Sequence, residues 1–531
     1  MNAMTHTALP RAATHSAYAD SLLRAPTLWA LMQRRVELTP DATMLIDAAT
    51  DRHWRYAQVA QAAEGLAAAF LAQGIGPGTA VTWQVPTSVS AILTALALAR
   101  LGAVQSPIIS LYREAEVRPI LERTRSAFYI VPAADPGRDF PAMARALQAS
   151  LETPPQLILL TDPVPQGDPA SLPPPPSDGR APNWIYYTSG TTSEPKGAMH
   201  CDDTLMIGGR NLGESMNATA QSIGSITFPF AHIAGAMYTS ILLSTGMSAV
   251  VLARFVPAEA VDILRSYKVT ITGGSTPHYV ALLAEQRKQP GIPLLPDLQV
   301  LAGGGAPKPP ALYFDVKKEM GVTIVHAYGM TEVPINVAGR CDGTDEQLAY
   351  SDGAPFPEVD VRIVREDGST AEVGEVGEVR VRGQGVFLGY TNPEANKLAF
   401  DAEGWFRTGD LGRFRPDGHL ALTGRLKDII IRKGENISAK ELEDLLYTHP
   451  KVGGVAVIGL PDPERGERVC AVVEPRQPGV HLGFEEMVKF FEDAHVMRQK
   501  IPEQLEIMDR LPRNETFNKI LKHVLRDRFA A

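Results

Sequence analysis

The chain has 531 residues, of which 44% are hydrophobic and 21% charged, and its formal net charge is −9. This length exceeds one compact core, so we expect at least two domains, and the acidic balance argues against a nucleic-acid-binding protein. The three cysteines, Cys201, Cys341 and Cys470, lie far apart, which argues against a disulfide framework or a zinc site and favours a reducing cytoplasm.

The N-terminal region predicts alternating helices and strands. Its first residues hold no sustained apolar segment after a basic start, so we expect no secretory signal. The apolar stretch 89–104 is interrupted by Arg100 and is too short to cross a bilayer, which favours a buried helix. Further elements are predicted as a helix at 28–36, a strand at 43–46, a helix at 56–71, a strand at 80–85 and a helix at 88–100. Such alternation is typical of an α/β architecture with a largely parallel sheet.

The rest of the chain predicts a second lobe, a barrel and a small domain. Prolines between 163 and 176 indicate a stiff surface connection between two α/β lobes. Strands of the second lobe are predicted at 223–228, 248–252, 269–272, 298–301 and 323–326. From Gly353 onward, short strands with glycine turns indicate a small β-barrel. We therefore predict a large N-terminal domain, residues 1–426, and a small mobile α+β domain, residues 427–531.

The segment YTSGTTSEPKG, Tyr187–Gly197, is the first candidate for a binding site. Small hydroxyls and a bare glycine let the backbone approach an anion closely, and a lysine adds charge. A strand predicted at 184–187 precedes it, which is where α/β proteins commonly hold phosphates. The residue order does not fit a Walker P-loop, and an ordinary solvated turn is the alternative. The predicted phosphate-binding residues are Thr188, Ser189, Gly190, Thr191, Thr192 and Lys196.

Four more strings accompany this loop: FPFAHIAG at 228–235, AGGGAPKP at 302–309 with HAYGMTE at 326–332, WFRTGDLG at 405–412, and GRLKDIIIRKGENI at 424–437. In these strings and their order the chain resembles the adenylate-forming superfamily of acyl-CoA synthetases, adenylation domains of peptide synthetases, and luciferases. The resemblance covers nearly the whole chain. It implies an enzyme that joins a carboxylic acid to AMP and then to a thiol, using ATP, Mg²⁺ and coenzyme A.

Activating a carboxylate requires that the like charges of the acid and of ATP be neutralised and positioned. The resemblance places the β- and γ-phosphates against the hydroxyl loop and Lys196. It assigns Mg²⁺ to Glu332 and Thr191, and the α-phosphate to Thr331. It identifies Lys519 as the catalytic lysine that reaches the α-phosphate and the acyl carboxylate.

The remaining nucleotide contacts follow from the same strings. Tyr328 offers a flat face for adenine, and the resemblance assigns both ribose hydroxyls to Asp410 with support from Arg425. Alone, these residues would be interpreted as a buried aromatic residue and a turn aspartate. The other predicted nucleotide-binding residues are Gly304, Gly305, Ala306, Ala327 and Gly329.

The C-terminal string LPRNETFNKILK, at 511–522, resembles the lysine loop of the superfamily with two departures. Asn518 replaces the usual glycine, and one residue is inserted after Arg513. Asparagine can adopt the left-handed backbone conformation that glycine supplies, so we expect the loop to survive. By the same resemblance Lys427 is the hinge of the small domain, and Gly434 borders the pantetheine tunnel of coenzyme A.

The acyl pocket is predicted to be wide and apolar. Its expected substrate contacts are His232, Gly235, Gly274 and Gly303, although a lone histidine in an apolar run is more often a core residue. The further small residues expected there are Ala236, Gly273, Ser275, Gly304 and Gly305. They leave room for a bulky alicyclic, steroid-like, terpenoid-like or fatty acid, and a string near Leu101 resembles ligases for such acids.

Three functions fit these residues. The first is an acid–CoA ligase, and the second is a stand-alone adenylating enzyme that loads a carrier-protein thiol. The third, a non-catalytic nucleotide-binding scaffold, is disfavoured because the charged site residues are all present. Whether the chain forms a homo-oligomer stays open.

Overall fold

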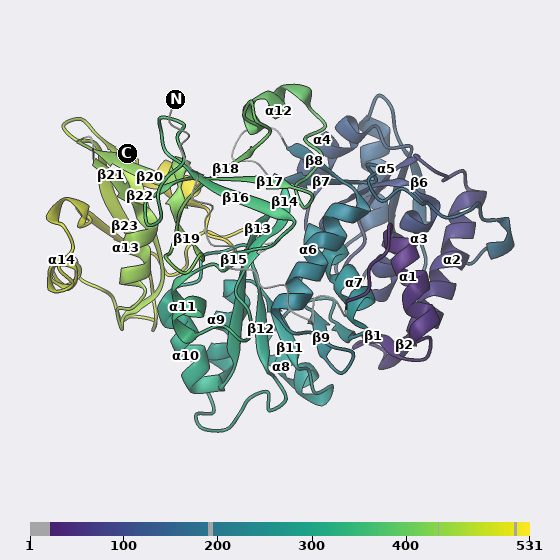
Figure 1. Cartoon of the computed structure of the whole chain (residues 1–531), viewed down its shortest axis with the longest axis horizontal. Coiled ribbons are helices and arrows are strands. Elements are labelled where there is room, and N and C mark those ends of the chain that lie inside the picture. Colours follow the sequence, from purple (N-terminus) through teal and green to yellow (C-terminus); the bar gives the residue numbers. More distant parts are fainter. Residues whose placement is uncertain (1–21, 189–194, 434, 515–517, 531) are drawn as a thin grey trace, which may run out of the picture.

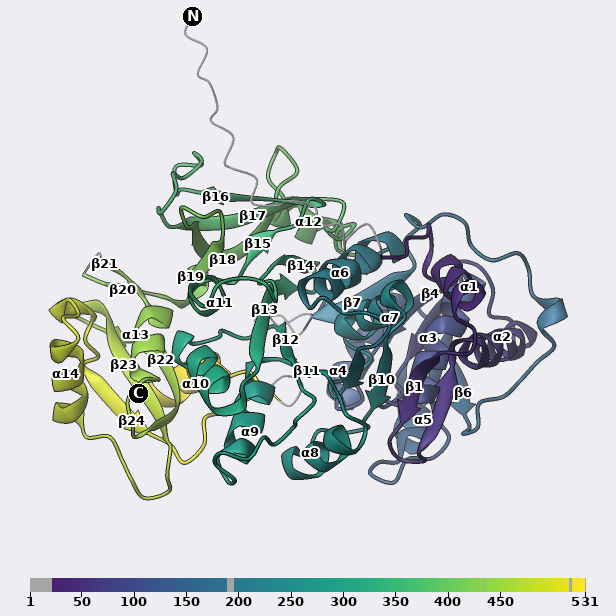
Figure 2. The same ribbon diagram turned by 60° about the horizontal axis from the view of Figure 1, so that its bottom comes forward.

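The computed structural model describes residues 22–188, 195–433, 435–514 and 518–530. In Figures 1 and 2 the N-terminal third of the chain forms one side of the molecule and the last hundred or so residues form the opposite side. The middle of the chain lies between them. No helix in the described ranges combines the length and the apolarity needed to span a membrane.

The first sheet has six strands in the order β6-β5-β3-β4-β7-β8, parallel except for the last pair. Its strands are β3 Ala80–Trp83, β4 Val104–Pro107, β5 Phe128–Pro132, β6 Gln156–Leu160, β7 Trp184–Thr188 and β8 Lys196–His200. Its helices are α2 Tyr56–Ala72, α3 Val89–Leu101, α4 Glu114–Thr124 and α5 Phe140–Ser150. Ser88 caps α3 by accepting a hydrogen bond from the Ala91 amide, and Gly102 ends it with φ 69°. The predicted apolar stretch is therefore a buried helix, not a membrane span.

The proline-rich segment does not connect two lobes, contrary to the prediction. It leaves β6 and returns to β7, and Trp184 of β7 pairs with Gln105 of β4 in the same sheet. A short 3₁₀ turn, Pro169–Ser171, lies within it. Proline composition indicates an extended segment, but it cannot indicate which strands the segment joins.

The second lobe contains two sheets, and the N-terminal residues contribute to it. Strands β1 and β2 join β10 and β9 in the order β2-β1-β10-β9, and β11 to β15 follow in sequence order. The strands are β1 Thr43–Asp47, β2 Arg52–Arg55, β9 Ile223–Ile226, β10 Ser248–Val251, β11 Ile271–Gly274, β12 Val300–Gly304, β13 Thr323–Met330, β14 Val333–Ala338 and β15 Ala354–Pro355. The helices are α1 Leu28–Leu38, α6 Asp202–Ser215, α7 Ile233–Thr245, α8 Pro257–Ser266, α9 Thr276–Gln286, α10 Pro310–Met320 and α11 Asp345–Tyr350. The two lobes are therefore interleaved in sequence.

The predicted barrel is a four-stranded antiparallel sheet in the order β16-β17-β18-β19. Its elements are β16 Val359–Val364, β17 Gly377–Gly383, β18 Phe406–Phe414, β19 Leu420–Arg425 and helix α12 Pro393–Ala399. The outer strands β16 and β19, which the structure describes completely, do not pair with each other, so this ladder is open. Its strands pack on a cluster that also includes Tyr328, which brings the sheet to the edge of the site.

The C-terminal residues form a smaller α+β unit with its own core. Its sheet has the order β21-β20-β23-β22, with β24 beside β23. The elements are β20 Ile429–Arg432, β21 Glu435–Ser438, β22 Val452–Asp462, β23 Gly466–Pro475, β24 Gln504–Ile507, α13 Ala439–Leu446, α14 Phe484–Asp493, α15 Lys522–Phe529 and the 3₁₀ turn Arg498–Lys500. Two hydrophobic clusters fill this unit. The mixed α/β fold with a large and a small part agrees with the prediction.

Candidate active site

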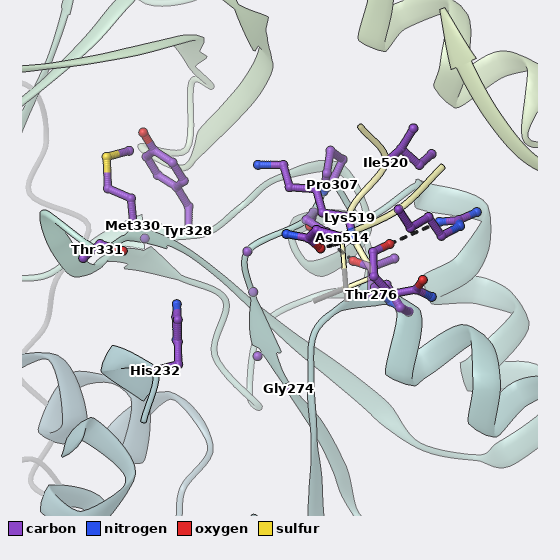
Figure 3. A pocket seen from close by; sticks show the side chains of 18 of the residues that line it. His232, Gly274, Thr276, Pro307, Tyr328, Met330, Thr331, Asn514, Lys519 and Ile520 are labelled. Atoms are coloured by element: carbon purple, nitrogen blue, oxygen red, sulfur yellow. Dashed lines mark hydrogen bonds between the residues drawn. The ribbon is translucent and has the colours of Figure 1, made fainter. Parts of the chain in front are cut away.

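One continuous cavity of about 2210 Å³ lies where the large part meets the C-terminal unit. It is lined by the carboxyl ends of β11, β12 and β13, by helix α7, by β18 and β19, and by residues of the lysine loop. The carboxyl ends of parallel strands are the usual binding edge of α/β sheets. Figure 3 shows Lys519 and Asn514 on one side of the cavity and Tyr328 and Thr331 on the other.

The predicted adenine and ribose residues lie together. The Tyr328 hydroxyl donates to Asp410 Oδ2 at 2.8 Å, and Arg425 Nε lies 3.0 Å from Asp410 Oδ1. Asp410 is buried in the middle of β18 and pairs in register with Arg425 of β19, which explains how distant strings converge. A carboxylate has further lone pairs, so these two partners leave acceptor capacity for ribose hydroxyls. Gly304, Gly305, Ala306, Ala327 and Gly329 also line the cavity.

Glu332, predicted to bind Mg²⁺, and Thr331, predicted to bind the α-phosphate, lie on the turn between β13 and β14. The Tyr390 hydroxyl donates to Glu332 Oε1 at 2.6 Å, and Tyr390 also carries Lys196 above its ring, with Nζ 5.4 Å from the ring centroid. Lys196 begins β8, opposite Thr188 at the end of β7. Ser189, Gly190, Thr191 and Thr192 lie outside the described residues.

The donor set suits a magnesium ion held mainly by phosphates. Among the described residues, no three His, Cys, Asp or Glu side chains come close enough to hold a metal ion together. Mg²⁺ in nucleotide sites is commonly bound by one or two protein oxygens plus substrate phosphates and water. The Glu332 carboxylate, half-buried at the cavity and oriented by Tyr390, fits such a ligand.

Described residues of the lysine loop on either side of 515–517 line the cavity, among them Asn514 and Lys519. The Asn514 amide donates to the Lys519 carbonyl and the Lys519 amide donates to Asn514 Oδ1, both at 2.8 Å. Arg513 pairs with Glu474 at 3.2 Å, which attaches the start of the loop to β23. Asn518 has φ 54°, so it adopts the left-handed conformation expected for the usual glycine. Burial, and then the nearby Arg425 guanidinium, lower the pKa of Lys519 to about 8.

On the acyl side, His232 caps helix α7. Its Nδ1 accepts a hydrogen bond from the Ala234 amide at 3.2 Å, and burial lowers its pKa to about 4. The imidazole is therefore neutral at physiological pH and lines the cavity. Both the structural and the substrate-facing interpretations of His232 are compatible with this geometry, because one ring can do both.

Comparison with known proteins identifies the family. The family model for the AMP-binding enzyme matches residues 32–391, and the model for the AMP-binding enzyme C-terminal domain matches residues 441–518. The chain belongs to the AMP-binding enzyme family. This confirms the predicted adenylate-forming superfamily and the prediction of an ATP-dependent ligase.

Relatives of this AMP-binding enzyme align over most of their length. It is 30% identical to the medium-chain fatty-acid–CoA ligase of Escherichia coli, covering 93% of this chain and 89% of the relative. It is also 30% identical to a salicyl-AMP ligase / salicyl-S-ArCP synthetase of Mycobacterium tuberculosis, over 86% of this chain and 82% of the relative. The crystal structure of ATP-bound MatB from Rhodopseudomonas palustris superposes with a TM-score of 0.85 at 26% identity, covering 96% and 99% of the two chains.

The boundary between the two parts of this AMP-binding enzyme lies near the predicted hinge. Lys427 occupies a 3₁₀ turn, Leu426–Asp428, between β19 and β20. Arg526 of α15 lies 2.7 Å from Asp428, which ties the end of this turn to the C-terminal unit. The Ser438 hydroxyl donates to the Thr423 carbonyl at 2.5 Å and links the unit to the large part. The hinge role stays a prediction, and Gly434 lies outside the described residues.

Several glycines are small for backbone reasons rather than to widen the pocket. A Cβ on Gly303 would lie 2.3 Å from the Gly274 carbonyl oxygen, and one on Gly304 would lie 2.0 Å from that of Ala327. Gly235 is outside the cavity lining that the structure describes, and a Cβ there would meet the Phe230 carbonyl at 1.9 Å. The glycines therefore do not by themselves indicate a bulky acid, contrary to the sequence-based argument.

Sequence reasoning missed two residues at the site, Tyr390 and His200. Tyr390 follows a glycine in the string VFLGYTNPE, which reads as an ordinary turn. His200 ends β8, where its Nε2 lies 2.7 Å from the Thr331 carbonyl and its Nδ1 lies 2.9 Å from the Thr204 hydroxyl. Burial lowers the pKa of His200 to about 4, so it is neutral at physiological pH.

Proposed function

We propose that this AMP-binding enzyme is an acid–CoA ligase for a mainly apolar carboxylic acid of medium length or bulk. The observation that carries the proposal is the uncharged wall of the cavity beside α7. Its main side chains are Leu212, Met216, Met237, Tyr238, Ile241 and Ile271. The lining residues of α7 run from Ile233 to Ile241, which at 1.5 Å per residue extends for about 12 Å. Such a wall suits an acid much longer than acetate.

The proposed reaction has two half-reactions. In the first, a carboxylate oxygen of the acid attacks the α-phosphorus of ATP, and the bond to the β-phosphate oxygen breaks to release pyrophosphate. In the second, the thiolate of coenzyme A attacks the acyl carbon, AMP leaves, and the thiol proton passes to solvent. Bound Mg²⁺ would neutralise phosphate charge during the first step.

We assign the roles of the residues from their places in the cavity. Asp410 and Tyr328 orient the nucleoside, which fixes the α-phosphate near the Thr331–Glu332 turn. Lys196, at the edge of the phosphate loop, binds the departing pyrophosphate, and Glu332 would hold Mg²⁺. Lys519 stabilises the negative charge that develops between carboxylate and α-phosphate.

A second candidate is a stand-alone enzyme that transfers the acyl group to a carrier-protein thiol. The observation that favours it is the 30% identity to the salicyl-S-ArCP synthetase, which equals the identity to the fatty-acid–CoA ligase. Both candidates share the first half-reaction and differ only in the thiol that consumes the adenylate.

A panel of acids tests the proposal. We expect acid-dependent pyrophosphate release with straight-chain, alicyclic or aryl acids, and little with acetate or a short dicarboxylic acid, because the α7 wall offers no charge for a second carboxylate. Mass spectrometry should then show acyl-CoA formed at the expense of acyl-AMP. If none of the acids caused pyrophosphate release, both candidates would be refuted. If acyl-AMP accumulated despite coenzyme A, the ligase would be refuted.

The pH dependence of adenylation should report Lys519. With a pKa of about 8, roughly nine in ten of these side chains carry a proton at pH 7 and roughly one in ten at pH 9. If the ammonium is the active form, kcat/KM for ATP should fall about tenfold over this range, because kcat/KM reports the free enzyme. The variant Lys519→Arg stays charged and should be slower but without this decline. A parallel decline in both enzymes would assign the titration to another group.

A further inference from the structure

His200 connects two sheets beneath the proposed phosphate site. It is the last residue of β8, in the six-stranded sheet, and it is completely buried. Its Nε2 lies 2.7 Å from the carbonyl oxygen of Thr331, on the turn after β13 in the five-stranded sheet. A carbonyl only accepts, so Nε2 carries a proton and donates it to this bond. The ring thus fixes the backbone of Thr331 relative to β8.

The same turn is held from its other side by the segment 386–391. The Phe387 amide donates to the Glu332 carbonyl at 2.8 Å, in addition to the bond between the Tyr390 hydroxyl and the Glu332 carboxylate. This segment lies alongside β8, because the Met199 amide donates to the Gly389 carbonyl at 2.9 Å. The turn is therefore attached to β8 directly through His200 and indirectly through segment 386–391.

Strand β8 also carries Lys196, four residues before His200. All five residues of β8 pair with β7, and this pairing keeps the strand in position. The distance between the Lys196 backbone and the Thr331–Glu332 turn is consequently set by two attachments, of which the His200 bond to Thr331 is the direct one. Lys196 is proposed to bind the phosphates of ATP directly and Glu332 to bind them through Mg²⁺. The distance between the two therefore determines how well both can bind the same triphosphate.

We propose that His200 is a positioning residue that holds the Thr331–Glu332 turn in register with Lys196, so that one Mg²⁺–ATP complex contacts both. The inference rests on the proposed function, because it takes Glu332 as the metal ligand and Lys196 as a phosphate ligand. His200 touches neither substrate, and its effect passes through the Thr331 carbonyl.

The test compares two variants of the full chain by calorimetric titration with ATP, with and without Mg²⁺. Glutamine at position 200 places an amide donor where the Nε2 of histidine lies, whereas leucine fills similar volume without a donor and leaves the Thr331 carbonyl unpaired. We expect His200→Leu to reduce the Mg²⁺-dependent gain in ATP affinity about tenfold, and His200→Gln to keep it within about threefold. Adenylation should slow in His200→Leu, while thioester formation from supplied acyl-AMP stays within about threefold.

Two controls separate positioning from packing. His449 is also a buried histidine but lies in the C-terminal unit, where its ring packs against Phe490, so His449→Leu should lower thermal stability without changing the effect of Mg²⁺. Should His200→Leu not fold, His200→Asn gives the same contrast with His200→Gln, because its shorter amide cannot reach Thr331.

Two results would overturn the inference and leave the proposed function standing. One is that His200→Leu keeps the Mg²⁺ dependence of the wild type, and the other is that His200→Gln loses as much of it as His200→Leu. Wild-type ATP binding that Mg²⁺ does not affect would overturn the metal assignment and the inference together.

Discussion

Replacing Lys519 by alanine is expected to slow acid-dependent pyrophosphate release by about 10²–10³-fold, the usual loss when one positioned donor to a developing charge is removed. Thioester formation from supplied acyl-AMP should stay within a few-fold of wild type. The loss is expected in adenylation because Lys519 lines the same cavity as Asp410 and Arg425, the residues predicted to bind the nucleotide. The two rates are measured separately, by pyrophosphate release without coenzyme A and by AMP release from chemically prepared acyl-AMP.

A matched lysine in the same unit controls for loss of charge. Lys451 forms an ion pair with Glu486 at 2.7 Å and is absent from the cavity lining that the structure describes, so Lys451→Ala should change neither rate measurably. Loss of both half-reactions to the same extent in Lys519→Ala would contradict the role in adenylation. It would indicate instead that the hydrogen-bonded pair Asn514 and Lys519 supports the fold of the C-terminal unit.

Local sequence patterns predicted the elements whose stability is local. Helix α3 was predicted from its mainly apolar stretch, and the structure shows Ser88 capping its start and Gly102 ending it. The strand predicted at 269–272 begins and ends two residues before β11, and the strand predicted at 298–301 begins two residues and ends three residues before β12, so both predictions omit the glycines at the strand ends. These two strands pair with each other, and a Cβ on Gly273 or Gly303 would lie 2.2 or 2.3 Å from a carbonyl oxygen of the neighbouring strand, so only glycine fits at these two positions. Strand pairing of this kind is not encoded in either segment alone.

Long-range strand pairing also explains why the sequence did not predict which segments belong to which lobe. Strands β1 and β2 precede the whole first sheet in the chain, but β1 pairs with β10, about two hundred residues later, and β2 pairs with β1. The proline-rich segment returns to its own sheet for the same reason, since β7 finds its partner in β4. Alternation of helices and strands predicts a parallel sheet without predicting which strands share it.

The same difference between local patterns and long-range contacts applies to the residues of the candidate site. Asp410, Arg425, Glu332 and Lys519 could be located because each stands in a recognisable string, and the structure brings them to one cavity. Tyr390 could not, because its relation to the site is a contact with Glu332, 58 residues away in sequence. The contact from His200 to Thr331 spans 131 residues. Residues that orient a functional group are identified by packing, and packing is known only from the fold.

The second large effect is expected from Asp410→Asn. Hydrogen bonds to a charged acceptor contribute about 1.5–3 kcal/mol, so loss of the carboxylate charge proposed to bind two ribose hydroxyls should raise KM for ATP about 10- to 100-fold. The substitution also leaves Arg425 without the anion that it faces at 3.0 Å, which should lower thermal stability. KM for ATP is measured by pyrophosphate release at saturating acid, and stability by thermal unfolding with and without ATP.

Two companion variants separate nucleotide binding from stability. Asp401 is another largely buried aspartate, paired with Arg380 at 3.0 Å and outside the described cavity lining, so Asp401→Asn should lower stability without raising KM. Tyr328→Phe removes only the hydroxyl that donates to Asp410, so it should raise KM by a smaller factor than Asp410→Asn. An Asp410→Asn enzyme that is less stable but binds ATP normally would show that Asp410 orients Arg425 and Tyr328 rather than the ribose. Because the three residues form one hydrogen-bonded group, the double variant Tyr328→Phe/Asp410→Asn should lose less than the sum of its parts.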